Sequence, residues 1–298
     1  MLTDDNLSRI RNRARGAINR VTQHKIIGND MKMLNIGCGD TANSQWVNID
    51  LGGGDNVTSH DVTKGLPFPD QSFDVVYHSH LLEHLPREKA LSFMGECFRI
   101  LKPGGIVRVL VPDLEQISRL YLEKLARAEE YETEYDWIML ELYDQCVREK
   151  SGGLMEQYLI DVAGSLTPFI ASRMGGGAAK YTETTKTQFV PAKLTWRNLS
   201  RTLYILRIEL AKLVVYAITG KKGQRAFAEG LFRHSGEVHR WMYDKFSLGR
   251  LMNNAGFAEI RVVSPLESSI PNFGHYNLDA VDGVVRKPDS LVMEGTRP

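Results

Sequence analysis

This 298-residue sequence has few cysteines, little net charge and no long uncharged apolar run, and each of these absences excludes a class of protein. Its three cysteines, Cys38, Cys97 and Cys146, are too few and too scattered for a disulfide framework or a cysteine-based zinc site. Its 37 basic and 36 acidic residues nearly balance, which argues against a general nucleic-acid binder. Charges interrupt the apolar stretch of residues 197–222, so it falls short of the about 18 uncharged residues of a membrane span. We therefore expect a protein of the reducing cytoplasm that has no nucleic-acid partner.

The most informative segment is a glycine turn between two short apolar runs, within residues 33–50. Gly37 and Gly39 lack a Cβ, so the backbone there can take a positive φ and pass close to a ligand. Asp50 ends the second run, where a carboxylate can accept hydrogen bonds from two ribose hydroxyls. This pattern predicts a pocket for an adenosine-containing cofactor, and a turn without a ligand is the alternative.

The same turn also fits the loose dinucleotide fingerprint G-x-G-x-x-A. In that pattern the acidic partner is expected about 20 residues further on. Asp50 comes only 13 residues after Gly37, which is too early. A nicotinamide-binding site is therefore disfavoured.

After this turn the sequence alternates between strand and helix. A buried parallel strand is predicted over residues 72–78, and a helix begins after Pro86. The helix stops at the Pro-Gly-Gly turn of residues 103–105, and the next strand runs to Val111. Strand, helix and strand in this order make a parallel crossover, so we expect an α/β fold.

In these motifs and their order the chain resembles the class I S-adenosylmethionine-dependent methyltransferases. The matching pieces are Leu34-Asn35-Ile36-Gly37-Cys38-Gly39, Asn48-Ile49-Asp50, Leu66-Pro67-Phe68, Phe73-Asp74-Val75-Val76, Leu82-Glu83-His84-Leu85 and Leu101-Lys102-Pro103-Gly104-Gly105. The chain is most similar to bacterial members often found near cell-surface polysaccharide genes. The resemblance covers residues 31–113 and 238–295.

This resemblance implies a Rossmann-like, mostly parallel seven-stranded sheet and the cofactor S-adenosylmethionine. Asp61 and Val62 are expected to close a short third strand. The family usually has Glu or Asp where Asn35 stands, so any electrostatic help to the cofactor's ammonium group is reduced to that of a neutral dipole. The cofactor-binding residues that the resemblance implies are Asn35, Gly37, Cys38, Gly39, Asp50, Asp61, Val62, His78 and Ser79.

The sequence also predicts how the chain is divided. Only nine residues, 37–45, separate the first two strands, so the first crossover is shortened and lacks its usual helix. We expect an amphipathic helix within residues 1–30 to cover that side of the sheet. Residues 31–113 and 237–298 then form the cofactor-binding core, and residues 114–236 form a large all-helical cap insertion that selects the substrate.

The apolar helix predicted over residues 197–219 has two interpretations. Its leucine repeat favours a helix that is buried within the cap. The basic end at Lys221, Lys222 and Arg225 leaves open a peripheral contact with a membrane or with a lipid-linked substrate.

Histidines are the candidates for proton transfer. Methyl transfer from a sulfonium needs chiefly the alignment of donor and acceptor, and a base only where the acceptor keeps its proton. We predict His80 for this role because it should point toward the cap, and His239 because it re-enters the sheet domain at the cap junction. A metal is the alternative use of His78, His80, His84 and Glu83. The position of Glu83 does not match the H-E-x-x-H pattern, so no metal is expected.

We therefore expect a cytoplasmic S-adenosylmethionine-dependent methyltransferase that O-methylates a saccharide or a related cell-surface polymer precursor, as a small molecule or linked to lipid. Two alternatives remain at this point. One is a nicotinamide-dependent oxidoreductase, and the other is a cofactor-binding or membrane-associated scaffold without turnover.

Overall fold

The computed structural model describes residues 31–162, 166–178 and 196–298, the last range with side chains from residue 203 onward. By their contacts, residues 33–298 form one unit. The helix predicted within residues 1–30 lies outside the described residues.

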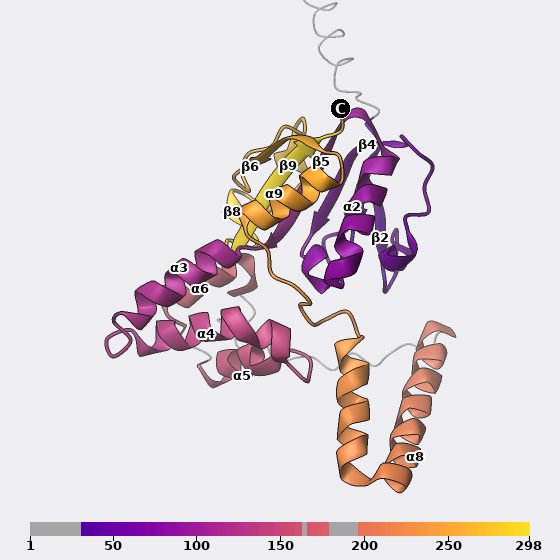
Figure 1. Ribbon diagram of the computed structural model, residues 1–298, viewed down its shortest axis with the longest axis vertical. Coiled ribbons are helices and arrows are strands. Elements are labelled where there is room, and N and C mark those ends of the chain that lie inside the picture. The colour runs from indigo at the N-terminus through magenta and orange to yellow at the C-terminus, as the bar shows by residue number, and fades with distance from the viewer. Residues whose placement is uncertain (1–30, 163–165, 179–195) are drawn as a thin grey trace, which may run out of the picture. The chain divides into compact units, whose positions relative to one another are not determined.

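The described strands form a seven-stranded sheet in the order β3-β2-β1-β4-β5-β9-β6 (Figure 1). Neighbours among the first five strands pair in parallel, and β9 runs antiparallel to both β5 and β6. The predicted Rossmann-like, mostly parallel seven-stranded sheet is therefore confirmed. The strands are β1 (Met33–Ile36), β2 (Val47–Asp50), β3 (Thr58–Ser59), β4 (Phe73–Ser79), β5 (Leu101–Pro112), β6 (Ala258–Val262) and β9 (Ser290–Thr296).

A loop without a helix joins β1 to β2, as the shortened first crossover predicts. The side chain of Asn48 orders this loop, because its amide nitrogen donates to the carbonyl oxygens of Asn43 and Trp46 at 2.8 and 2.9 Å. Its Oδ1 atom accepts a hydrogen bond from the backbone nitrogen of Asn43 at 3.1 Å. The buried amide of Asn48 thus fixes the conformation of this loop, which has no helix to do so.

The third strand ends earlier than the sequence predicts. β3 stops at Ser59, and Asp61 caps the short helix η1 (Val62–Lys64) instead. Its Oδ1 atom accepts from the backbone nitrogen and the hydroxyl of Thr63, at 3.0 and 2.7 Å. The prediction that Asp61 and Val62 close the strand is wrong, because the aspartate side chain competes with the strand by capping a helical turn.

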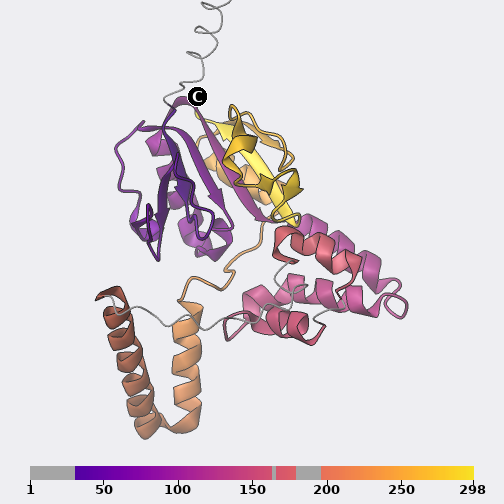
Figure 2. The same ribbon diagram turned by 180° about the vertical axis from the view of Figure 1, so that it is seen from behind.

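Two helices, α2 (Arg87–Ile100) and α9 (Lys245–Asn254), cover one face of the sheet (Figures 1 and 2). α9 begins with a capping box, in which Asp244 and Ser247 bond to each other's backbone nitrogens at 2.7 and 3.0 Å. Both helices pack into the same hydrophobic core as the strands. The helical residues they bury there are Ala90, Phe93, Met94, Cys97, Ile100, Leu248 and Met252.

An aromatic cluster joins the loop between β6 and β7 (Ala280–Val281) to the sheet. Within that loop lies the short helix η4 (Phe273–Tyr276). The ring of Tyr276 lies 5.3 Å from that of Trp46, and the ring of Phe273 lies 5.9 Å from that of Tyr77 on β4, measured between centroids. β7 then pairs with β8 (Val284–Val285) in a small hairpin. This loop and hairpin carry several residues of the candidate site.

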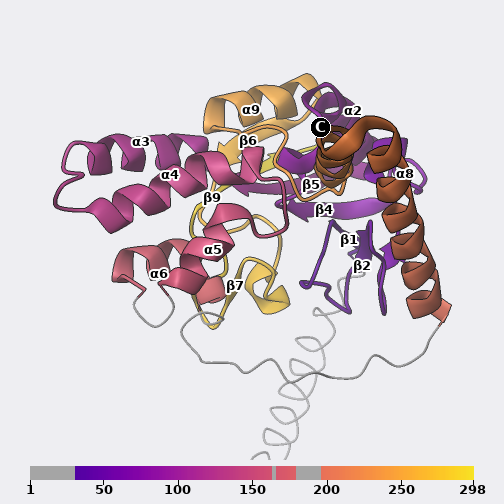
Figure 3. The ribbon, with the colours of Figure 1, turned by 90° about the horizontal axis from the view of Figure 1, so that it is seen from below.

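Helices also follow β5, where the cap insertion is predicted. Among the described residues they are α3 (Leu114–Leu125), α4 (Glu132–Val147), α5 (Gly153–Asp161) and α6 (Pro168–Met174), followed by the turn η3 (Gly175–Ala178). Figure 3 shows α3 and α4 side by side. A separate hydrophobic cluster holds these helices together, formed by Ile117, Trp137, Ile138, Leu159 and Ile170. The division into core and cap stays a prediction.

Gly175 marks where η3 meets the C-terminal segment. Its φ is +54°, and an added Cβ would lie 2.5 Å from Cδ of Pro288 and 2.7 Å from the carbonyl oxygen of Val285. A side chain cannot be placed there without moving the backbone. This close approach fixes η3 beside β8.

α8 (Trp196–Arg233) consists of two helical arms that meet at Gly220, whose φ of 71° and ψ of −169° interrupt the helix. Figure 1 shows the arms side by side, and the side chain of Gln224 donates to the carbonyl oxygen of Lys212 at 3.3 Å.

The prediction that this helix is buried is wrong. Two paired helices bury only the faces they share, so the outward apolar side chains stay exposed. Described apolar residues of the first arm that are 49–77% exposed are Leu203, Tyr204, Ile205, Leu206, Leu210, Leu213, Val214, Tyr216 and Ile218.

None of the helices in the described part of the chain combines the length and the apolar character needed to cross a membrane.

Candidate functional site

A cavity of about 340 Å³ lies where β1 and β4 end. Its walls include residues 37–41 of the glycine turn, residues 79 and 80 at the end of β4, and residues 285–287 at the end of β8. The strand order reverses between β1 and β4, and open α/β sheets bind their ligands in the crevice at such a point. We call this cavity the switch-point pocket.

The two glycines of the turn have different roles. Gly37 and Gly39 have φ of +67° and +48°. A Cβ at Gly37 would lie 3.0 Å from Cδ1 of Leu81, so close packing requires a glycine there. A Cβ at Gly39 would meet nothing within 4 Å. The backbone at Gly39 thus faces open space, where a ligand can approach it closely.

The carboxylate of Asp50 is fixed beside this turn. Its Oδ2 atom accepts a hydrogen bond from the backbone nitrogen of Gly39 at 3.1 Å, and its Oδ1 atom accepts one from Gly52 at 2.9 Å. Each carboxylate oxygen keeps capacity for a further donor. The structure therefore brings together the turn and the carboxylate that the sequence analysis singles out.

Asn35 and Cys38 are buried beside the same turn. The amide nitrogen of Asn35 donates to the carbonyl oxygen of Thr41 at 3.1 Å and to Oδ1 of Asn48 at 3.3 Å, so it holds the loop together. Burial, reinforced by the nearby charge of Asp50, raises the pKa of the Cys38 thiol to about 11. Cys38 lines the pocket as a neutral group.

Neighbouring residues of β4 separate, because side chains alternate along a strand. Ser79 lines the switch-point pocket, whereas the ring of His78 packs 5.2 Å from that of Phe93 on α2. His78 is fully buried, neither ring nitrogen has a hydrogen-bond partner within the described ranges of the chain, and burial lowers its pKa to about 3. Asn35, Asp50, Asp61, Val62 and His78 are not among the residues that line the pocket, and Asp50 adjoins it through its bond to Gly39.

His80 reaches the pocket in a strained backbone conformation, with a φ of +51°. Its Nε2 atom lies 2.8 Å from Oγ of Ser290, and its Nδ1 atom lies 3.2 Å from Oε1 of Glu83. Burial lowers its pKa to about 3, so the ring is neutral at physiological pH. The role of proton acceptor stays a prediction, because Ser290 engages one ring nitrogen and a pKa of about 3 makes the ring a weak base.

His239 lies with Glu83 and His84 and is not among the residues that line the pocket. Its ring makes an edge-on contact with that of His84, with 4.7 Å between centroids. Burial lowers its pKa to about 3. The two predicted bases are therefore placed differently, with His80 at the pocket and His239 in a histidine and glutamate cluster.

A buried ion pair that the sequence analysis does not identify holds one wall of the pocket. Arg108, on β5 and 0% exposed, donates to Oδ2 of Asp279 at 2.6 and 2.8 Å and to Oε1 of Glu294 at 2.7 Å. The hydroxyl of Tyr77 donates to Oδ1 of Asp279 at 2.7 Å. The arginine within the apolar run of residues 106–111 is the signal in the sequence that could have identified this network.

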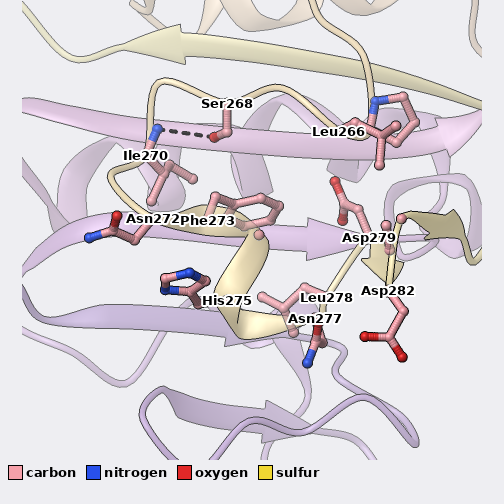
Figure 4. A pocket seen from close by; sticks show the side chains of 14 residues that line it. Leu266, Ser268, Ile270, Asn272, Phe273, His275, Asn277, Leu278, Asp279 and Asp282 are labelled. Carbon is pink, nitrogen blue, oxygen red and sulfur yellow. Dashed lines mark hydrogen bonds between the residues drawn. The ribbon is translucent and has the colours of Figure 1, made fainter.

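Asp279 also lines a second cavity of about 330 Å³, which the loop of residues 265–283 encloses (Figure 4). Pro265, Leu278 and Asp279 line both cavities, so the two adjoin. Within the loop, the backbone nitrogen of Ile270 donates to the hydroxyl of Ser268 at 3.0 Å. The ion pair with Arg108 thus anchors a loop that bounds the switch-point pocket.

Lys287 is another residue of the pocket that the sequence analysis does not identify. The residue is exposed, while partial desolvation of its amine lowers the pKa, with the charges of Glu83 and Asp289 opposing that shift. An amine at the wall of a pocket can pair with an anionic group of a ligand.

Comparisons with known proteins agree with this geometry. Residues 34–109 match the family described as "Methyltransferase domain". A 48-residue stretch is 46% identical to a protein of Mycolicibacterium smegmatis named "Probable S-adenosylmethionine-dependent methyltransferase", covering 16% of this chain and 18% of that protein. A 60-residue stretch is 47% identical to the ubiquinone/menaquinone biosynthesis C-methyltransferase UbiE of Vibrio parahaemolyticus, covering 19% of this chain and 22% of that protein. The chain thus spans only about a fifth of the length of these relatives.

Among solved structures, a SAM-dependent methyltransferase of Thermotoga maritima is 13% identical, with 92% of this chain and 86% of that one covered and a TM-score of 0.38. The SAM-dependent methyltransferase from Archaeoglobus fulgidus is 10% identical, with 94% and 92% covered and a TM-score of 0.36. The matched segment of residues 34–109 runs from β1 into β5 and so contains the parallel part of the sheet.

Proposed function

We propose that this chain transfers the methyl group of S-adenosylmethionine to an acceptor bound beside the switch-point pocket. The observation that carries the proposal is the bond between Asp50 and Gly39 at the point where the strand order reverses. The matched methyltransferase segment contains both residues. The open space at Gly39 and the fixed carboxylate of Asp50 fit a nucleoside.

The bound cofactor would supply an electrophilic methyl group, and the chain's own residues would hold and align the reactants. Asp50 would accept hydrogen bonds from the ribose hydroxyls. Backbone groups of residues 37–41 and the hydroxyl of Ser79 would contact the rest of the cofactor. Lys287 would meet an anionic group. The neutral ring of His80 would take up a proton from a hydroxyl acceptor, once ligand binding frees one of its nitrogens.

We further propose that the acceptor is a saccharide hydroxyl of a cell-surface polymer precursor, modified in the cytoplasm. The resemblance to bacterial members near polysaccharide genes supports this choice. The unpaired Cys38, Cys97 and Cys146 are in keeping with a reducing compartment. The exposed apolar side chains of α8, with the exposed Lys221 and Lys222 after them, support a peripheral membrane contact that would suit a lipid-linked acceptor.

Calorimetry and turnover together test the proposal. The protein should bind S-adenosylmethionine and its demethylated product, and should show no heat of binding with NAD at the same concentration. Incubation with nucleotide-activated or lipid-linked saccharides should release the demethylated product and add one methyl group to the saccharide by mass spectrometry. Binding without turnover on any saccharide would reject the acceptor and keep the cofactor. Absence of binding would reject the activity.

A further inference from the structure

We propose that Glu83, His84 and His239 form a binding site for a divalent transition metal of the zinc type. Each residue offers one ligand atom, and these atoms all lie within 4.8 Å of one another. The site goes beyond the proposed methyl transfer, which needs no metal. It also uses a different set of residues from the metal alternative raised by the sequence, because His239 comes from far along the chain.

Unsatisfied polar atoms on these three residues are the strongest support. The carboxylate of Glu83 is 0% exposed, and neither oxygen has a hydrogen-bond partner among the described residues. The Nδ1 atoms of His84 and His239 are buried and without a partner there as well. Burying a carboxylate without a hydrogen bond or an opposite charge costs several kcal/mol of folding free energy. Polar atoms buried without a partner therefore indicate a bound ligand. A single cation would satisfy all three side chains.

Backbone contacts hold the three residues in place independently of a metal. The carbonyl oxygen of Glu83 accepts hydrogen bonds from the backbone nitrogens of Arg240 and Trp241, at 2.6 and 3.2 Å. The backbone nitrogen of His239 donates to the carbonyl oxygen of Gln145 at 2.9 Å. The turn after β4 and the segment after α8 are thus joined where the ligand atoms converge.

Outer contacts also orient the ligands. A hydrogen bond to the backbone of Val238 engages the ring of His84. The Nδ1 atom of His80 lies 3.2 Å from Oε1 of Glu83 without a hydrogen bond between them. Metal-binding histidines commonly have a second partner such as the Val238 backbone, which fixes the ring.

The donor set selects the kind of metal. Two imidazole nitrogens and one carboxylate suit zinc, whereas magnesium and calcium prefer oxygen ligands throughout. Three protein ligands leave a fourth position for water or another oxygen ligand.

Two cationic side chains near the cluster oppose a further positive charge. Ion pairs with Asp144 at 2.9 Å and Glu237 at 3.3 Å offset the charge of Arg148. Lys287 is exposed, so water and salt screen its charge. Neither side chain is an ion-pair partner of Glu83 among the described contacts, so the carboxylate remains available.

Metal analysis of the whole protein tests the site. After removal of metals with a chelator, the protein is incubated with zinc chloride, passed through a desalting column and measured by mass spectrometry of the elements. We expect one zinc per chain and a higher melting temperature. Glu83→Gln and His239→Asn should each weaken zinc binding by more than the about 10–100-fold that the loss of an outer contact costs. His275→Asn, at an exposed histidine, should leave it unchanged.

Cobalt provides a second measurement that needs no variant. Cobalt(II) in a tetrahedral site with nitrogen ligands absorbs visible light far more strongly than the hydrated ion, and zinc should displace it in equal amount. A protein without stoichiometric zinc or these bands would overturn the proposal, as would Glu83→Gln and His239→Asn variants that bind zinc as tightly as the parent. If both variants fail to fold, His84→Gln takes their place. Calorimetry with S-adenosylmethionine on metal-free protein measures cofactor binding, so the proposed methyl transfer is tested separately from the metal site.

Discussion

The Oδ2 atom of Asp50 accepts a hydrogen bond from the backbone nitrogen of Gly39 at 3.1 Å, so the carboxylate and the glycine turn act as one unit. Asp50→Ala removes that bond and the acceptor for the ribose hydroxyls. We expect S-adenosylhomocysteine to bind more weakly by about 1–3 kcal/mol, because charge-assisted hydrogen bonds are lost. Titration calorimetry measures the change.

Asp55→Ala is the matched control, because Asp55 is an exposed acidic residue in the following loop. It should bind the ligand like the parent. Equal loss in the two variants would mean that net charge near the pocket, and not the bond to Gly39, governs affinity.

The thiol of Cys38 should react slowly despite its place at the pocket. Burial and the charge of Asp50 raise its pKa to about 11, about two units above the ordinary value of 9.0. The thiolate fraction at pH 8 is then about a hundredfold smaller than for an ordinary thiol, and it rises tenfold per pH unit up to the pKa. Alkylation with iodoacetamide, followed by peptide mass spectrometry between pH 7 and 10, measures the rate. Alkylation at pH 8 as fast as that of N-acetylcysteine would contradict the assignment.

The parallel half of the fold could be predicted because its signals are local. The glycine turn, the nine-residue connection at 37–45 and the Pro-Gly-Gly turn each specify a strand end or a helix stop within a few residues. The early end of β3 could not be predicted in this way. Whether Asp61 extends a strand or caps a turn depends on which hydrogen bonds are available to Thr63, and both outcomes suit the sequence.

The residues of the candidate site also fall into those with local sequence signals and those that only long-range contacts bring together. Gly37, Gly39 and Asp50 belong to one contiguous motif, so the sequence alone brings them together. Asp279 is held at the pocket by long-range contacts, among them its ion pair with Arg108, 171 residues away along the chain. No periodicity links positions that far apart. Such contacts depend on tertiary packing and become visible only in the structure.

Replacing Arg108 should destabilise the whole sheet domain. Arg108→Leu leaves the buried carboxylates of Asp279 and Glu294 without their cation, which costs about 3–5 kcal/mol. Urea unfolding followed by circular dichroism measures the free energy of unfolding. Arg261→Leu is the matched control, because Arg261 pairs with the same Glu294 at 3.5 Å but is 57% exposed. It should cost no more than about 1 kcal/mol. Similar losses in the two variants would show that the Arg108 network is not compensating buried charge.

Stability on the acid side should depend on Glu96. Hydrogen bonds from Arg99, and one from the backbone nitrogen of Leu66, lower the pKa of this carboxyl below its ordinary 4.5. Because the folded state favours the ionised form, this contribution is present above pH 4.5 and disappears as the pH falls through the lowered pKa. Glu96→Gln should lose about 0.5–1 kcal/mol at pH 7 and converge with the parent once the pH falls below the lowered pKa. Urea unfolding across this range checks it, with the exposed Glu88→Gln as the control.

The exposed apolar side chains of α8 should bind anionic lipid. Leu210 and Leu213 are each 62% exposed, and the exposed Lys221 and Lys222 follow on the same hairpin. Inserting a leucine into the interface contributes about 1.5–3 kcal/mol, so the double change to glutamate should reduce binding by about a hundredfold or more. Flotation with phosphatidylglycerol vesicles measures it, and Leu122→Glu, at a leucine of α3 that is 63% exposed, should behave like the parent. If the parent protein does not float with anionic vesicles, the membrane contact is contradicted. The lipid-linked acceptor would then be rejected, whereas methyl transfer to a soluble saccharide would be unaffected.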